Sequence, residues 1–252
     1  MNKGYVKSET ENKIATLIFY HPQSNSLPSY LLNEMIEKFN ELSADKKVNV
    51  IILKGGGDKA FCAGASFDEL VEIDSLEEGK KFFMNFANLI NSIRKCNKIV
   101  VGRIHGKVVG GGVGLVSVCD YSFATENAAL RLSELALGLG PFVVGPPIER
   151  KIGKESFVEM SLDCQWRSAA WGKEQGFYYN ICADSNELDE KVINFANQLA
   201  ERSPEALTSL KKIFWEGTDH WDELLEQRAE NSGRLVLSDY TKKFIKDFKL
   251  KN

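Results

Sequence analysis

The stretch Val109-Gly110-Gly111-Gly112-Val113-Gly114-Leu115 is the most informative part of this chain, because a similar small-residue turn precedes it at residues 59–67. Both turns follow an apolar run typical of a strand and lead into a segment that favours a helix. Glycine in such a turn lets a ligand approach the bare backbone. The start of a helix also leaves unpaired N–H groups and a partial positive charge. Two such turns can direct two backbone donors at one oxygen that becomes negative during a reaction.

A lone carboxylate follows the second turn. Glu134 lies in an apolar neighbourhood between Ser133 and Leu135. Burial among apolar groups raises the pKa of a carboxyl toward neutrality, which suits acid/base catalysis. The alternative is a structural role, in which Glu134 bonds to backbone at a helix start or strand end. The glycine turn itself matches neither the dinucleotide-binding fingerprint nor the phosphate-binding loop, because the required glycine and lysine spacings are missing.

Composition excludes several other classes of protein. The chain has 252 residues, is 43% hydrophobic and has a formal net charge of -3, which argues against a nucleic-acid-binding surface. The five cysteines form no C-x-x-C pair, so we expect buried thiols, a cytoplasmic location and no metal site. We expect no secretion signal, because the first five residues lack an apolar run, and no membrane span. A serine hydrolase is disfavoured, because no G-x-S-x-G elbow occurs.

Apolar periodicity predicts an α/β fold with mainly parallel strands. The expected strands are Ile14–Tyr20 and Ile99–Ile104, with residues 48–53, 121–124 and 129–132. The expected helices of the first part are one opened by Pro28 and two at residues 75–96 and 113–118. Three further helices, at residues 186–202, 204–216 and 220–248, are expected to follow without intervening strands. We therefore divide the chain into a core, residues 1–197, and a C-terminal helical region, residues 198–252.

Three segments together resemble the crotonase family, also called the enoyl-CoA hydratase/isomerase superfamily. They are residues 59–70, 99–120 and 131–153. The family's Ala-Gly-x-Asp turn is similar to residues 63–66, where serine replaces aspartate. Its Gly-Gly-Gly turn ending in Cys-Asp matches residues 110–120, and its Pro-Glu pair matches Ser133-Glu134. The resemblance implies a spiral of β-β-α turns with C-terminal helices that assemble homotrimers or dimers of trimers.

The resemblance also implies a substrate and a site. The substrate would be an acyl-CoA thioester, with no cofactor beyond the CoA that the substrate carries. The oxyanion-hole N–H groups would belong to Ala65 and Gly111, and the acid/base carboxylate to Glu134. The residues expected to contact substrate or CoA are Ser26, Leu27, Lys59, Ala63, Ser66, Phe67, Gly110 and Gly114. Lys59 would lie near the CoA phosphates or would simply be a solvated loop lysine.

The chain departs from this family at Gly114, where two-glutamate hydratases carry their first glutamate. Hydration through Glu134 alone, isomerisation between C2 and C4, and decarboxylation all stay open, as does an acyl-CoA-binding or RNA-binding protein without catalysis. Residues 111–115 and 133–141 look like bacterial 3-methylglutaconyl-CoA hydratases, which also lack that glutamate. Hydration is therefore the leading prediction. Arg131 and Lys107 are candidate partners for a substrate carboxylate, although both also read as surface residues.

Overall fold

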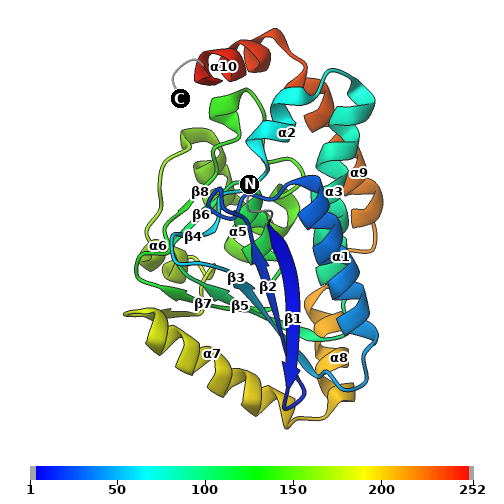
Figure 1. Ribbon diagram of the computed structural model, residues 1–252, viewed down its shortest axis with the longest axis vertical. Helices are drawn as coiled ribbons and strands as arrows, with labels where there is room; N and C mark the ends of the chain where they lie inside the picture. The colour runs from blue at the N-terminus through cyan, green and yellow to red at the C-terminus, as the bar shows by residue number, and fades with distance from the viewer. Residues whose placement is uncertain (1–3, 250–252) are drawn as a thin grey trace.

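The computed structural model describes residues 4–249 and contains two sheets in an α/β arrangement (Figure 1). The larger sheet has the order β1 (Tyr5–Glu11), β2 (Ile14–Tyr20), β3 (Val50–Gly55), β5 (Ile99–Ile104), β7 (Tyr121–Thr125) and β9 (Asn180–Cys182). The smaller sheet has the order β4 (Ala60–Cys62), β6 (Lys107–Val109) and β8 (Leu130–Arg131). Among the strand pairs within residues 4–249, β1 and β2 alone are antiparallel, so the predicted α/β class with mainly parallel pairing is confirmed.

The helices alternate with these strands and then continue alone to the C-terminus. The first group comprises α1 (Ser29–Ala44), α2 (Phe67–Glu72), α3 (Leu76–Lys95), α4 (Gly111–Ser117), the 3-10 turn η1 (Leu135–Leu137), α5 (Gly145–Asp163) and α6 (Ala169–Glu174). The C-terminal group comprises α7 (Ser185–Ala200), α8 (Pro204–Phe214), α9 (Trp221–Val236) and α10 (Asp239–Lys249). None of the helices within residues 4–249 is long and apolar enough to cross a membrane.

The central strands β3 and β5 of the larger sheet are buried on both faces, which explains their continuous apolar runs. In β3, Val50 and Ile52 pack with the apolar face of α7, which runs below the sheet (yellow in Figure 1). The alternate residues Ile51 and Leu53 belong to the main core with residues of α1 and α3. The strand period of two thus divides one apolar run between two cores.

The C-terminal helix α9 packs along α3 of the same chain. The two helices approach closely where Gly79 meets Gly233, since a Cβ on Gly79 would lie 2.8 Å from the Gly233 Cα. The predicted segment boundary after residue 197 falls inside the last turn of α7. The two predicted segments include residues 1–3 and 250–252, which lie outside the described residues. The expected lack of a secretion signal rests on the first five residues, so most of those residues also lie outside the described part.

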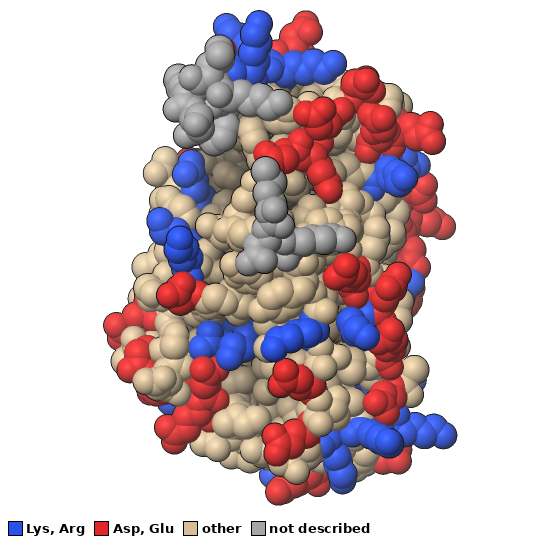
Figure 2. Space-filling model, viewed as in Figure 1, with Lys and Arg blue, Asp and Glu red and all other residues tan. Residues whose placement is uncertain are grey.

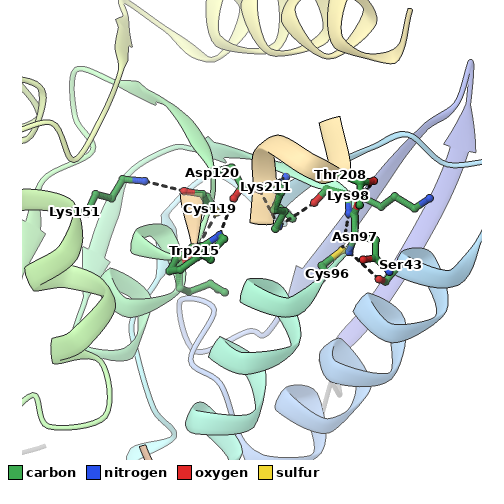
Figure 3. A network of polar contacts seen from close by, with 12 residues as sticks. Ser43, Cys96, Asn97, Lys98, Cys119, Asp120, Lys151, Thr208, Lys211 and Trp215 are labelled. Carbon is green, nitrogen blue, oxygen red and sulfur yellow. Dashed lines mark hydrogen bonds and ion pairs between the residues drawn. The ribbon is translucent and has the colours of Figure 1, made fainter. Parts of the chain in front are cut away.

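Helix α8 is attached to the core through one buried ion pair (Figure 3). The Lys211 ammonium lies 2.8 Å from the Asp120 carboxylate, and both side chains are almost completely buried. The indole N–H of Trp215 and the backbone N–H of Val100 also donate to Asp120, at 3.1 and 2.7 Å. The ammonium donates in addition to the carbonyl oxygen of Lys98, at 2.9 Å. The start of β7 is thereby tied to β5 and α8.

The prediction of one helix over residues 220–248 was wrong. The chain bends after Val236, and α10 starts at Asp239 as a separate helix. The Ser238 hydroxyl accepts a hydrogen bond from the backbone N–H of Thr241 at 3.3 Å, the arrangement of a helix N-cap. The serine could have been recognised as a stop and start signal within an otherwise continuous amphipathic pattern.

Candidate active site

The two small-residue turns meet side by side, as the sequence predicts. Strands β4 and β6 are parallel neighbours, so the turns that follow them leave the same edge of the smaller sheet. Gly64 has φ +90°, and a Cβ there would lie 2.9 Å from the carbonyl oxygen of Val109 and 3.3 Å from the backbone nitrogen of Gly111. Only a glycine permits this approach. Ala65 and Gly111 both line the cavity at this point.

Glu134 reaches the same place from the third strand of that sheet. Gly110 donates its backbone N–H to the carbonyl oxygen of Arg131 at 2.9 Å, which fixes β8 beside the second turn. Glu134 follows β8 and precedes η1, and its own carbonyl accepts hydrogen bonds from Leu137 and Leu139, both at 3.0 Å. A Cβ on Gly110 would lie 3.2 Å from the Glu134 Oε1. This glycine, at φ +52°, therefore leaves room for the carboxylate.

The Glu134 carboxylate is poised for proton transfer. Its Oε2 atom is buried and has no hydrogen-bond partner among the described residues. Burial raises the pKa of Glu134 to about 7, and the backbone N–H groups of Glu134 and Ser133 oppose this shift only in part. A carboxyl with a pKa near neutrality exchanges protons readily in both directions at physiological pH. Its side chain does not cap η1.

A cavity of about 270 Å³ opens in front of these groups. Its wall is mostly apolar, and its other lining residues are Ala63, Gly64, Phe67, Leu70, Phe83, Phe86, Gly110, Ser133, Leu137, Leu139, Gly140, Pro141, Phe142, Val143, Val144, Ser232 and Phe244. Among these described residues Glu134 is the one titratable side chain. Two backbone donors and one buried carboxyl can stabilise a developing oxyanion and move a proton beside it.

The far wall of the cavity comes from two segments. Leu70, Phe83 and Phe86 form one part, and the lining residues from Leu137 to Val144 form the other. Pro146 and Pro147 follow in the first turn of α5. Proline is tolerated at that position because the first N–H groups of a helix have no partner within it.

The residues that the resemblance assigns to substrate or CoA separate into three groups. Ala63, Phe67 and Gly110 line the cavity with Ala65 and Gly111. Leu27 lies just behind, where its N–H donates to the carbonyl of Gly64 at 2.8 Å. Ser66, Ser26, Lys59 and Gly114 do not line this cavity.

Each of those four residues has another position. Ser66 caps α2, accepting a hydrogen bond from Glu69 N–H at 3.3 Å. The Ser26 hydroxyl lies 3.0 Å from the Nδ1 atom of His21. Lys59 lines a separate hollow of about 110 Å³ with His21 and neighbouring turn residues. Gly114 is buried in α4 behind the cavity wall.

Val144 explains structurally why position 114 carries no side chain. A Cβ on Gly114 would lie 2.4 Å from Val144 Cγ1 and 2.7 Å from Val144 Cβ. Val144 lines the cavity, so this valine fills the space into which a side chain from position 114 would extend. The cavity wall beside position 114 is therefore apolar.

Gly114→Ala is expected to lower the free energy of unfolding by about 1–2 kcal/mol. Overpacking against Val144 costs about 1–3 kcal/mol, which exceeds the gain of about 1 kcal/mol from replacing glycine within a helix. Urea denaturation measures the loss. Val144→Ala in the same chain removes the closest contact, so the double variant should lose less than the sum of the two single variants. Strict additivity would show that the two positions are not coupled.

The two candidate partners for a substrate carboxylate lie elsewhere. Arg131 donates through Nε to the carbonyl oxygen of Cys164 at 2.6 Å. Both Lys107 and Arg131 lie against the ring of Trp166, at 5.2 and 5.9 Å from its centroid. Neither cation lines the cavity. On the face shown in Figure 2, basic and acidic side chains are interspersed rather than gathered in one basic patch.

Two lining residues escaped the sequence analysis because they belong to the C-terminal helices. Ser232 lies on α9 and Phe244 on α10. Gly138, at φ +82°, marks where α10 approaches, since a Cβ there would lie 2.5 Å from the Tyr240 ring. The C-terminal region therefore completes the cavity of its own chain. In the sequence, a glycine shortly after Glu134 was the one feature that marks this contact.

Comparison with known proteins places this geometry in a family. The model of the enoyl-CoA hydratase/isomerase family matches residues 9–249. A probable enoyl-CoA hydratase of Bacillus subtilis is 28% identical over 237 residues, which cover 93% of this chain and 92% of that protein. A peroxisomal Δ(3,5)-Δ(2,4)-dienoyl-CoA isomerase of Arabidopsis thaliana is also 28% identical, covering 82% and 79%.

A solved structure shows the same fold. The crystal structure of enoyl-CoA hydratase from Bacillus halodurans superposes with a TM-score of 0.90 at 22% identity, covering 96% of this chain and 99% of that one. The predicted spiral fold with a C-terminal helical region is thus confirmed. The family match extends over nearly the whole described chain and includes both small-residue turns and Glu134. The chain therefore belongs to the enoyl-CoA hydratase/isomerase family.

Proposed function

We propose that this enzyme adds water to a 2-enoyl-CoA thioester, with Glu134 as its acid and base. The observation that carries this proposal is the position of Glu134, the one titratable side chain among the described cavity residues, beside the meeting point of the two turns. The names of similar proteins support hydration, including a short-chain enoyl-CoA hydratase of Clostridium acetobutylicum that is 28% identical over 219 residues.

The proposed reaction uses one carboxylate twice. The Glu134 carboxylate takes a proton from water while the water oxygen forms a bond to C3. Electrons of the C2–C3 double bond move toward the thioester, whose oxygen becomes negative and accepts hydrogen bonds from Ala65 N–H and Gly111 N–H. Glu134 then returns the proton to C2. Each backbone donor contributes about 10²–10³ in kcat in comparable oxyanion holes.

The CoA moiety would approach past the first turn. Ala63 lines the cavity there, and Lys59 lies in the neighbouring hollow, where it could meet a phosphate. No cofactor beyond the substrate's own CoA is required by this mechanism. A homotrimer or dimer of trimers and a cytoplasmic location stay predictions from the resemblance.

The acyl group that the cavity best suits is uncharged. The candidate 3-methylglutaconyl-CoA carries a carboxylate, which needs a cationic or amide partner when buried. The described cavity lining has no lysine or arginine, and Arg131 and Lys107 lie against Trp166 instead. Crotonyl-CoA is therefore the reference substrate, and 3-methylglutaconyl-CoA the alternative to compare with it.

Isomerisation of a 3-enoyl-CoA is the second candidate. The observation that favours it is the apolar wall at Val144, because one carboxylate without a second acid/base group is sufficient to move a proton between C2 and C4. The oxyanion hole would have the same role in this reaction.

Absorbance at the conjugated enoyl-thioester band distinguishes the two reactions. With crotonyl-CoA and 3-methylglutaconyl-CoA, hydration predicts a fall in absorbance. The fall should be faster with crotonyl-CoA. With 3-enoyl-CoA, isomerisation predicts a rise. A rise with 3-enoyl-CoA and no change with either conjugated substrate would replace hydration by isomerisation. No change in absorbance with any of the three substrates would contradict both proposals.

A further inference from the structure

Phe142 stands between the active-site cavity and a second hollow. The cavity of about 270 Å³ and a groove of about 370 Å³ share the lining residues Leu139, Gly140, Pro141 and Phe142. These four residues lie within the segment between η1 and α5. The groove therefore continues from the active-site wall rather than lying at a distant part of the surface.

The groove is largely apolar and open. Leu135, Val158 and Leu162 line it with 44%, 38% and 67% of their surface exposed. Phe157 lies beside them, and Glu149 and Arg228 supply its charged groups. Neighbouring exposed aliphatic side chains on a folded chain mark a surface that binds something apolar.

Phe142 is half-buried, whereas its neighbours Leu139 and Pro141 in the shared wall are buried. The Phe142 ring lies over Gly140, where a Cβ would be 2.5 Å from its Cζ atom, and its backbone N–H donates to the Gly140 carbonyl at 2.7 Å. Elsewhere the wall is backed by buried helices, as where Phe86 of α3 packs on Gly111. The half-buried ring of Phe142 lines both hollows, so its displacement would connect them at this point.

We propose that the acyl chain of the substrate runs past Phe142 into this groove, and that Phe142 sets the chain length the enzyme prefers. This inference rests on the proposed function, because it places the thioester carbonyl at Ala65 and Gly111. Short acyl groups fit within the cavity with Phe142 closed. Longer chains displace the ring and lie on Leu135, Val158 and Leu162. Each methylene that gains burial there contributes a factor of about four to affinity.

A chain-length series tests the inference. kcat/KM is measured for 2-enoyl-CoA substrates of four, eight, twelve and sixteen carbons. Phe142→Ala is expected to raise the ratio of the twelve-carbon to the four-carbon value by about tenfold, from the burial of two or more methylenes. Phe142→Leu should give a smaller change in the same direction. Leu162→Asp should lower the twelve-carbon value about tenfold more than the four-carbon value, because it places a charge in the groove.

Two controls separate this effect from general loosening of the site. Phe83→Ala removes a ring that lines the cavity but not the groove, so it should not raise the twelve-carbon to four-carbon ratio by tenfold. Ile213→Asp places a charge at an exposed aliphatic residue of α8, which lines neither hollow, and should leave the series unchanged.

The inference fails if Phe142→Ala and Phe83→Ala change the series equally, or if Phe142→Ala leaves it unchanged. It also fails if Leu162→Asp alters sedimentation but not the series, since the groove would then be a contact between copies of this chain. If no enoyl-CoA is turned over, the proposed function fails separately. Calorimetric Kd values for butyryl-CoA and lauroyl-CoA then give the same ratio, which Phe142→Ala should still shift about tenfold if the groove binds acyl chains.

Discussion

Glu134→Gln is expected to lower kcat for enoyl-CoA hydration by about 10²–10⁴ while the chain stays folded. The amide has nearly the same shape as the carboxyl group, but it can neither take the proton from water nor return it to C2. Backbone donors at Ala65 and Gly111 stay in place, so substrate binding should change little. Stopped-flow absorbance with crotonyl-CoA measures the loss. Glu174→Gln, an exposed residue on α6, is the matched control and should keep wild-type turnover.

The pH dependence of the same variant supplies a second readout. Because burial raises the pKa of Glu134 to about 7, the carboxylate form that starts the reaction is lost as pH falls through that value. Wild-type kcat/KM should therefore rise with pH through an inflection near 7, and the residual activity of Glu134→Gln should lack it. Wild-type turnover in Glu134→Gln, or the same inflection in both proteins, would contradict the assignment.

The contribution of Glu134 to the free energy of unfolding should fall as pH rises, whereas kcat/KM should rise. A folded-state pKa above the ordinary carboxyl value means that the folded chain binds this proton more tightly than the unfolded chain. The contribution of Glu134 to stability is therefore present at low pH and lost as pH rises from the ordinary value through about 7. At pH 8 Glu134→Gln should be more stable than wild type, by up to about 3 kcal/mol. Equal denaturation midpoints at pH 5 and pH 8 would show that the carboxyl is solvated.

Lys211→Met is expected to lower the free energy of unfolding by about 3–5 kcal/mol, the largest stability loss in this set. The variant leaves the Asp120 carboxylate buried without its cation, although Val100 N–H and Trp215 still donate to it. A buried charge without its counter-charge costs more than the packing that methionine retains. Chemical denaturation followed by tryptophan fluorescence reports the loss, because Trp215 contacts the same carboxylate.

A double variant separates loss of the pair from general damage to α8. Adding Asp120→Asn to Lys211→Met removes the unpaired charge, and the asparagine oxygen can still accept a hydrogen bond from Val100 N–H. The double variant should be more stable than Lys211→Met alone. Lys212→Met, at an exposed position one residue later, is the matched control and should change stability by less than about 0.5 kcal/mol. A loss below about 1 kcal/mol for Lys211→Met would show that the pair is exchangeable with solvent.

Strongly periodic elements were predictable from the sequence. Ile14–Tyr20 and Ile99–Ile104 form strands with those bounds, and the helix expected at residues 75–96 is α3. Other elements were not predicted, including the 19-residue helix α5. Strand β9 has three residues, too few for a pattern to emerge, and β1 alternates mostly polar side chains at a sheet edge. Burial in these segments depends on neighbours distant in sequence, and the sequence alone does not display those neighbours.

The features of the site also divide into those that the sequence predicts and those that it does not. The two turns and Glu134 are local patterns, so their approach at one sheet edge follows from parallel strands. Val144 occupies the space beside Gly114, and Phe244 contributes to the cavity wall. Both contacts join segments 30 or more residues apart in the sequence, so no local pattern encodes them. Gly114 departs from the family pattern in the sequence itself, whereas its contact with Val144 depends on the fold.

The most direct test of the central claim is the rate at which deuterium enters C2 when crotonyl-CoA is converted in D₂O, followed by mass spectrometry and NMR of the product. The claim that Glu134 delivers the proton to C2 predicts one deuterium at C2 with wild-type enzyme. It also predicts a rate at least about 10² lower for Glu134→Gln. Deuteration of C2 at an unchanged rate in Glu134→Gln would show that another group moves the proton, and would contradict the account.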